Sequence, residues 1–170
     1  MELLERFTRG DVAAFESLFR QFHPEVHRWI AKLVRDEAAA EDLTIETFLR
    51  IHRARARFDP ARGFGAWARR IATNVAIDYL KSARHEVELP PDLSDTPLPQ
   101  DDPELRDAIR RAFGQLPTRL RVPATLSLID EQSNREIAAA MDISEAAVKS
   151  RVFRATRLLR QKLQRWGMQL

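Results

Sequence analysis

The stretch SNREIAAAMDISEAAVKSRVFRATRLLR, residues 133–160, predicts two helices joined by a tight turn. Ser133 and Glu136 have the spacing of a capping box, in which two side chains satisfy the free amides at a helix start. Ser144 can cap a second helix, and the two residues before it are left for the turn. Two short helices joined in this way form a helix-turn-helix, which can place its second helix in the major groove of DNA.

The second helix of this stretch has one apolar side and one basic side. Residues that step by four, three and four form the side expected to be buried: Val148, Val152, Ala155 and Leu159. The candidate DNA-binding residues lie off that side: Lys149, Ser150, Arg151, Phe153 and Arg154. A basic face that meets only solvent is the alternative, but the caps, the turn and the aromatic residue together favour DNA. The motif is also similar to the output domains of LuxR-type response regulators, so it does not identify the function by itself.

Charge is unevenly distributed along the chain, although its net value is only +3. Residues 49–85 hold nine Lys and Arg against two Asp and Glu, a net charge of +7. Residues 133–170 hold eight against three, a net charge of +5, whereas residues 86–107 between them hold one against eight, a net charge of −7. Two basic blocks separated by an acidic segment indicate a polyanion that is contacted in two places.

The acidic, proline-rich segment at residues 85–103 is expected to link two domains. It ends at Asp102 and Pro103, which are typical of a helix N-cap followed by a first helical position. We therefore divide the chain into a first domain at residues 1–84 and a second domain at residues 104–170.

Both domains are expected to be all-helical, because apolar residues follow helical spacing and no strand-like alternation is bounded by turns. In the first domain, Asp11 begins a helix that Pro24 is expected to end or restart. The segment FDPARG at 58–63 consists of turn-forming residues. The remaining expected helices are 26–34, 38–55, 64–84, 104–114, 118–130, 134–141 and 145–166.

The helix expected over 64–84 has a second candidate nucleic-acid surface. Four residues on one side combine cations, an amide and an apolar group, as in proteins that bind single strands: Arg70, Asn74, Ile77 and Lys81. The side expected to be buried consists of Ala68, Ile71, Val75 and Tyr79. The aromatic residues Phe64, Trp67 and Tyr79 are more typical of a core than of a platform for bases. Asn74 has no packing role on this pattern, so it could hydrogen-bond a base edge or simply be exposed.

Asp42 and Glu46 lie four residues apart and share one face of the helix expected over 38–55. No histidine or third acid joins them at a metal-ligand spacing. A surface for a basic partner and a face that only meets solvent both remain open.

Several classes of protein are disfavoured. The chain has no cysteine, and its four histidines form no metal-ligand pattern, so we expect no metal, no cofactor and no catalytic residue. No apolar run approaches the length that spans a bilayer, and the N-terminal MELLERFTRGD lacks the apolar core of a signal peptide. We expect a cytoplasmic protein without a membrane partner.

Taken together, these segments resemble a bacterial RNA polymerase sigma factor of the extracytoplasmic-function (ECF) group. The resemblance covers nearly the whole chain in family order: GDVAAFESLF (10–19), AEDLTIETFLRIHRA (40–54), FDPARGFGAWARRIATNVAIDYL (58–80), Leu116-Pro117 and the stretch at 133–160. A response regulator would instead need strands and a phospho-acceptor aspartate in the first block. The resemblance implies an all-α promoter-specificity subunit with a sigma2-like domain and a sigma4-like domain.

The resemblance also implies roles for residues of the first domain. The helix at 40–54 would dock on the clamp helices of the largest polymerase subunit, and Asp42 and Glu46 match the acidic contact positions. Ile45 stands where the family usually has glutamine. The domain would melt the −10 element, with Asn74 lining the pocket for a flipped base. The residues assigned to this contact are Arg62, Gly63, Phe64, Gly65, Arg70, Asn74 and Lys81, with Phe64-Gly65 in place of a usual Ser-Phe pair.

For the second domain, the resemblance implies recognition of the duplex −35 element by Lys149, Ser150, Arg151, Phe153 and Arg154. The implied partners are core RNA polymerase and promoter DNA, duplex at −35 and single-stranded at −10. The acidic linker would thread the RNA-exit side of the polymerase. The chain is expected to be a monomer, and the sequence leaves open whether an anti-sigma factor binds it.

Overall fold

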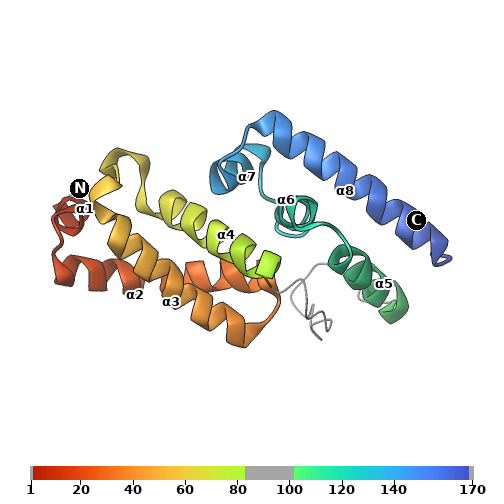
Figure 1. The fold of residues 1–170 in the computed structure, drawn as a ribbon, viewed down its shortest axis with the longest axis horizontal. Coiled ribbons are helices and arrows are strands. Elements are labelled where there is room, and N and C mark those ends of the chain that lie inside the picture. Colours follow the sequence, from red (N-terminus) through yellow and green to blue (C-terminus); the bar gives the residue numbers. More distant parts are fainter. Residues whose placement is uncertain (1, 83–101, 169–170) are drawn as a thin grey trace. The chain divides into compact units, whose positions relative to one another are not determined.

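The computed structural model describes residues 2–82 and 102–168, and within these ranges the chain forms helices and no strand (Figure 1). The expected all-helical fold is therefore confirmed. The described residues form two compact units, each built largely from one of these ranges. The expected linker lies outside the described residues up to position 101, so the domain limits derived from the sequence stay predictions.

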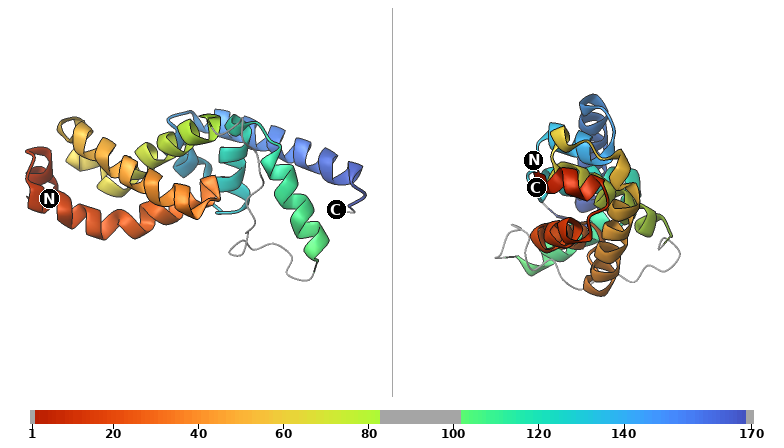
Figure 2. Two further views of the ribbon diagram at one scale, coloured as in Figure 1. Left: turned by 60° about the horizontal axis from the view of Figure 1, so that its bottom comes forward. Right: turned by 90° about the vertical axis from the view of Figure 1, so that its left-hand side faces the viewer.

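The first unit packs three long helices side by side and closes one end with short ones (Figures 1 and 2). Its elements are α1 (Glu2–Thr8), α2 (Val12–Val34), α3 (Glu37–Ala54), the 3-10 turns η1 (Arg55–Arg57) and η2 (Pro60–Arg62), and α4 (Phe64–Ser82). Each of α2, α3 and α4 contacts the other two, so the core lies between them. The helices expected over 38–55 and 64–84 are confirmed within the described residues.

Helix α2 corrects the expectation that Pro24 ends or restarts a helix, because α2 runs through Pro24 without a break. A proline removes one backbone hydrogen bond and crowds the preceding turn, which normally disfavours a helix interior. Here Pro24 lies on the exposed side of α2, whereas Leu18 and Ile30 on either side of it are buried in one core. Burial along the whole length of α2 outweighs the lost hydrogen bond.

Helix α1 was not expected from the sequence, yet its Phe7 is fully buried. The Phe7 ring lies 5.7 to 6.3 Å, between ring centroids, from four other aromatic rings: Phe15, Phe58, Phe64 and Trp67. These rings come from α2, from the segment before η2 and from α4. Helix α1 therefore closes the end of the core where the chain turns from α3 into α4.

The second unit consists of α5 (Pro103–Gly114), α6 (Thr118–Leu128), α7 (Asn134–Met141) and α8 (Glu145–Arg165). The expected helix restart is confirmed, since the Asp102 carboxylate accepts a hydrogen bond of 3.0 Å from the Leu105 amide and α5 begins at Pro103. Helix α8 packs against both α5 and α6. Their shared core holds Ala108, Ala112, Phe113, Leu116, Leu120, Ala124, Ala155, Leu159 and Leu163.

Candidate nucleic-acid interface

The start of α7 is held by the expected capping box. The Ser133 hydroxyl accepts a hydrogen bond of 3.2 Å from the Glu136 amide, and the Glu136 carboxylate accepts one of 2.9 Å from the Ser133 amide. Two backbone donors that the helix cannot satisfy are thus paired locally. Ile137 is then fully buried on the inner side of α7.

The turn between α7 and α8 is equally well defined. Asp142 has a φ of 56°, a left-handed conformation that ends α7. The next amide, that of Ile143, donates to the Ala138 carbonyl at 3.1 Å. The Ser144 hydroxyl then accepts from the Ala147 amide at 3.1 Å and begins α8. The expected helix, turn and helix are therefore confirmed by local hydrogen bonds.

Helix α8 turns one side to the core and the other to solvent. Val148, Ala155 and Leu159 are buried as expected, and Val152 is half-buried. On the opposite side Phe153 is 70% exposed, although an aromatic ring of this size gains most from burial. The candidate DNA-binding residues lie around it, with Lys149, Ser150 and Arg154 exposed and Arg151 half-buried.

Helix α4 carries the second group of candidate nucleic-acid residues, and they lie on a single exposed face. Arg70, Asn74 and Lys81 are all exposed, and Ile77 among them is half-buried. The buried side is rotated from the expected one, since Ile71 and Tyr79 are only half-buried. The residues that fill the core instead are Phe64, Ala68, Ala72, Val75, Ala76 and Leu80. This rotation leaves Asn74 clear of the core, as the candidate role requires.

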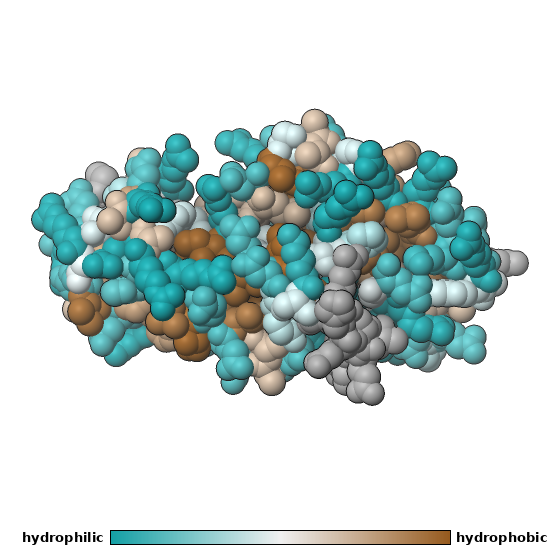
Figure 3. Space-filling model, in the orientation of Figure 1, coloured by the Kyte–Doolittle hydropathy of each residue, from teal (hydrophilic) through white to brown (hydrophobic). Residues whose placement is uncertain are grey.

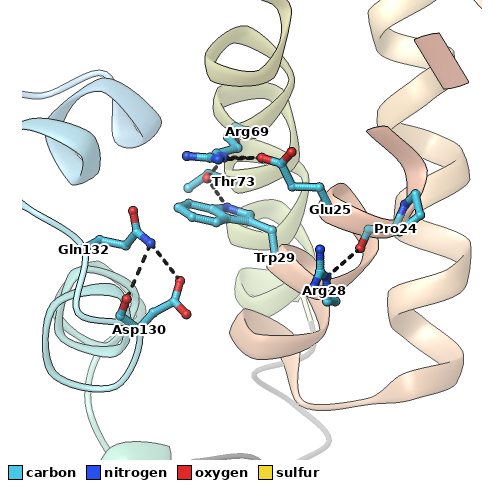
Figure 4. Close-up of polar contacts among 8 residues, drawn as sticks. All are labelled: Pro24, Glu25, Arg28, Trp29, Arg69, Thr73, Asp130 and Gln132. Atoms are coloured by element: carbon cyan, nitrogen blue, oxygen red, sulfur yellow. Dashed lines mark hydrogen bonds and ion pairs between the residues drawn. The ribbon is translucent and has the colours of Figure 1, made fainter. Parts of the chain in front are cut away.

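A polar anchor between α2 and α4, formed by Glu25, Trp29, Arg69 and Thr73, fixes this rotation (Figure 4). The buried Trp29 indole donates a hydrogen bond of 2.9 Å to the Thr73 hydroxyl, which itself donates to the Arg69 carbonyl at 2.7 Å. The Arg69 guanidinium donates to the Glu25 carboxylate at 2.7 Å and lies 5.4 Å from the centre of the Trp29 ring. Thr73 precedes Asn74, so the anchor holds α4 with the amide of Asn74 on the outer side.

The loop before α4 brings together the candidate residues Arg62, Gly63, Phe64 and Gly65. Gly63 has a φ of 74°, which disfavours any residue with a side chain. A Cβ atom on Gly65 would lie 3.3 Å from the Phe22 ring, so glycine permits a close approach there. The Phe64 ring is 3% exposed and belongs to the core, as the sequence favoured; Arg62 remains exposed.

A different kind of surface lies on α3. Asp42 is exposed and Glu46 is half-buried, and both share a face with Ile45 and Leu49, which are 49% and 46% exposed. On the face shown in Figure 3, hydrophobic patches lie among more numerous hydrophilic residues. Sequence reasoning did not include Leu49, although its spacing of seven residues from Asp42 places it on the same face. Acidic and apolar groups together fit a protein partner with basic and apolar groups better than they fit DNA.

Arg50 connects this α3 face to α4. Its guanidinium donates to the Glu46 carboxylate at 2.8 Å and to the Asp78 carboxylate at 3.1 Å. These two acids raise the pKa of Arg50 above its ordinary value. Glu46 is therefore held in a defined orientation before any partner binds. This contact between α3 and α4 was not visible in the sequence, because its acids come from different helices.

Within residues 2–82 and 102–168, no group of three or more His, Asp or Glu is arranged to hold a metal ion. None of the helices described there combines the length and apolar character needed to cross a membrane.

Comparisons with known proteins connect these faces to one family. A family model for Sigma-70 region 2 matches residues 18–86, and one for Sigma-70, region 4 matches residues 106–159. The chain is 37% identical over 166 residues to the RNA polymerase sigma factor CarQ of Myxococcus xanthus, covering 94% of this chain and 95% of CarQ. It is 36% identical to the ECF RNA polymerase sigma factor BldN of Streptomyces coelicolor, covering 94% of this chain and 64% of BldN. This chain belongs to the ECF sigma factors.

A solved structure supports the same assignment. The structure of CnrH in complex with the cytosolic domain of CnrY matches this sigma factor with a TM-score of 0.64 and 26% sequence identity, over 95% of each chain. Sigma factors are the promoter-specificity subunits of RNA polymerase. Region 2 of this sigma factor contains the α3 face, the loop before α4 and the exposed face of α4. Region 4 contains the helix-turn-helix.

We predict that Thr73→Val destabilises the first unit by about 1–3 kcal/mol, because the buried Trp29 indole would lose its hydrogen-bond acceptor. Thr73→Ser keeps the hydroxyl and serves as the matched control, with a much smaller loss. Urea unfolding of the full chain, followed by tryptophan fluorescence, measures both. Equal destabilisation by Val and Ser would show that the hydroxyl is not what holds α4.

Proposed function

We propose that this sigma factor binds core RNA polymerase through α3, reads the −10 element with α4 and its preceding loop, and reads the −35 element with α8. The observation that carries the proposal is that region 2 and region 4 each contain an exposed face suited to DNA. We keep the domain limits 1–84 and 104–170, with the segment 85–103 as the link between the two DNA contacts.

Docking on the polymerase is assigned to the α3 face. Asp42 and Glu46 supply negative charge, and Ile45 and Leu49 supply apolar area that is otherwise left in water. A partner with basic and apolar side chains would bury that area and pair with the acids. The hydrogen bond from Arg50 orients Glu46 in advance and lowers the entropic cost of forming such a contact.

Recognition of the −10 element is assigned to the exposed face of α4. A base that leaves the duplex stack exposes its pairing edge, which an amide side chain can read with a donor and an acceptor. Asn74 is exposed and is held there by the anchor around Thr73. Lys81 and Arg70 lie on the same face and would contact the phosphates of the separated strands.

Recognition of the −35 element is assigned to the N-terminal half of α8. The capped start of α8 can enter the major groove, where Lys149 and Arg154 would pair with guanine edges or phosphates. Ser150 is suited to several bases, and the Phe153 ring is exposed toward the same side. Arg151 is half-buried and fits a supporting contact with the backbone of the DNA.

The chemistry of transcription belongs to the polymerase, so we assign the chain no catalytic step and no cofactor. We place it in the cytoplasm, because its partners there are core polymerase and promoter DNA, and we propose that it is a monomer. The solved relative CnrH is bound to the cytosolic domain of CnrY, and by analogy we propose that a regulatory protein binds this chain as well. A stand-alone helix-turn-helix regulator is disfavoured, because it has no use for a region 2 domain.

The proposal is tested by transcription in vitro from genomic DNA of the source bacterium, using its core polymerase with and without the full chain. We expect new, reproducible 5′ ends only when the chain is present. If the set of 5′ ends is the same with and without it, the proposed function is wrong.

Asn74→Ala should impair promoter melting by roughly five- to 150-fold, because an amide that reads a base contributes about 1–3 kcal/mol. Binding of the same holoenzyme to closed duplex promoter should change little. Permanganate reactivity of unpaired thymines measures melting, and gel shift at low temperature measures closed-complex binding. Ser82→Ala, an exposed change on the same helix, is the control. Equal losses in both assays would contradict a flipped-base role for Asn74.

Arg154→Ala should weaken binding to the −35 element by about 1–3 kcal/mol and leave the affinity for core polymerase unchanged. Arg119→Ala removes an exposed arginine from α6 and serves as the matched control. Promoter binding by the holoenzyme and capture of core polymerase by the tagged chain measure the two effects. A parallel loss of polymerase binding would count against the assignment of Arg154 to DNA.

A further inference from the structure

The exposed side of α8 continues well beyond the residues assigned to base recognition. Helix α8 has 21 residues, so it is about 31 Å long, and Lys149 to Arg154 occupy only its first half. After Phe153 and Arg154, the side facing away from the core continues with five exposed residues: Arg157, Arg160, Gln161, Gln164 and Arg165. The second half of this surface has no role in the function proposed above.

The cations of this surface are not paired within the described parts of the chain. Neither the Arg157 nor the Arg160 side chain takes part in a hydrogen bond or ion pair there, and the same holds for the side chains of Lys149 and Arg154. Arginines that serve the fold behave differently. Arg50 and Arg69, for example, each bind a carboxylate of a neighbouring helix.

Lys162 of the same helix shows that the pairing of a cation depends on the side of α8 that it occupies. It lies on the inner side, half-buried, and its ammonium donates to the Gln115 side chain at 2.8 Å. Arg157 and Arg160 lie on the outer side, where α8 offers no acid beyond Glu145 in its first turn. Within residues 2–82 and 102–168, no acid therefore pairs with their charge.

The composition of this surface favours phosphate over a protein partner. Among the described residues, the large apolar side chains that are exposed are Val12, Ile45, Leu49, Leu128 and Phe153, and none lies in the second half of α8. Protein interfaces have an apolar centre, as on the α3 face, whereas phosphate contacts need only cations and polar donors. The arginine side chains supply the cations, and the glutamine side chains supply polar donors.

The position of these arginines fits a DNA backbone beside the recognised bases. At 1.5 Å per residue, Arg157 and Arg160 lie about 12 and 17 Å from Lys149 along the axis of α8. The major groove is about 12 Å wide, so a helix that enters by its N-terminal end brings its next two turns to the phosphates at the groove edge. We infer that Arg157 and Arg160 bind the DNA phosphate backbone flanking the −35 element, independently of its sequence. This inference rests on the proposed function of α8.

The test uses the full chain and a fluorescein-labelled 30-base-pair duplex of arbitrary sequence, because a phosphate contact does not depend on a promoter. The variant is Arg157→Gln with Arg160→Gln, and its affinity is measured between low and physiological salt. Each lost phosphate contact should lower the slope of log affinity against log salt by about 0.9, so the pair should lower it by about 1.8. The two-lysine variant Arg157→Lys with Arg160→Lys keeps both charges and should keep the slope.

The matched control removes two other cations of the second unit, through Arg106→Gln with Arg119→Gln. It has the same net charge as the α8 variant and should leave the slope almost unchanged. Thermal unfolding is measured for every variant, because Arg157, Arg160 and Arg119 are exposed whereas Arg106 is half-buried. An equal change of slope in the control would show that the slope depends only on the net charge of the chain, and it would overturn the inference.

Two further outcomes separate this inference from the function on which it rests. If the α8 variant keeps its salt slope but loses affinity for core polymerase, the surface binds a protein and the inference is wrong. If the unmodified chain initiates transcription at promoters while the α8 variant binds DNA with an unchanged slope, only the inference fails. If the unmodified chain supports no promoter-dependent initiation, the proposed function itself is wrong.

Discussion

The hydrogen bond from the Trp29 indole to the Thr73 hydroxyl sets the rotation of α4 about its own axis. Rotation matters because one turn of a helix distributes its residues over all sides, so a small twist would bury Asn74 and expose core residues. The exposed faces of α3 and α8 also depend on the rotation of their helices, which buried residues set. Buried Phe48 and Ile51 orient α3, and buried Val148, Ala155 and Leu159 orient α8. Each surface of this sigma factor is therefore defined by what the opposite side of its helix buries.

The helix-turn-helix was predictable because its determinants are local. The bonds of Ser133 with Glu136 and of Ser144 with Ala147 join residues three apart, and such spacing is visible in a sequence. The aromatic cluster around Phe7 was not predictable, since its rings come from separate segments of the first unit. The expectation for Pro24 was wrong for the same reason, because burial contributed by other helices outweighs a local rule. The candidate residues on α3 and α4 were proposed from their spacing, whereas the contact of Arg50 with Asp78 could be seen only in the fold.

The two units use arginine in different ways. In the first unit Arg50 and Arg69 join helices and thereby orient the residues next to them, Glu46 and Asn74 among others. In α8 the side chains of Arg154, Arg157 and Arg160 make no hydrogen bond or ion pair with the described residues. The first arrangement gives preorganised contacts, whereas the second keeps long side chains that can adapt to a polyanion. The contrast fits a protein that docks on another protein with one surface and follows a nucleic-acid backbone with another.

The unpaired side of α8 has a consequence for the free protein. Arg154, Arg157 and Arg160 follow one another at intervals of three, so neighbouring charges on the helix surface repel each other, by a few tenths of a kcal/mol for each pair. Added salt screens this repulsion and strengthens the isolated helix, while it weakens the attraction of the same side chains for DNA. A rise in ionic strength therefore stabilises α8 in the free protein and weakens its binding to DNA. Both effects act on the same three arginines.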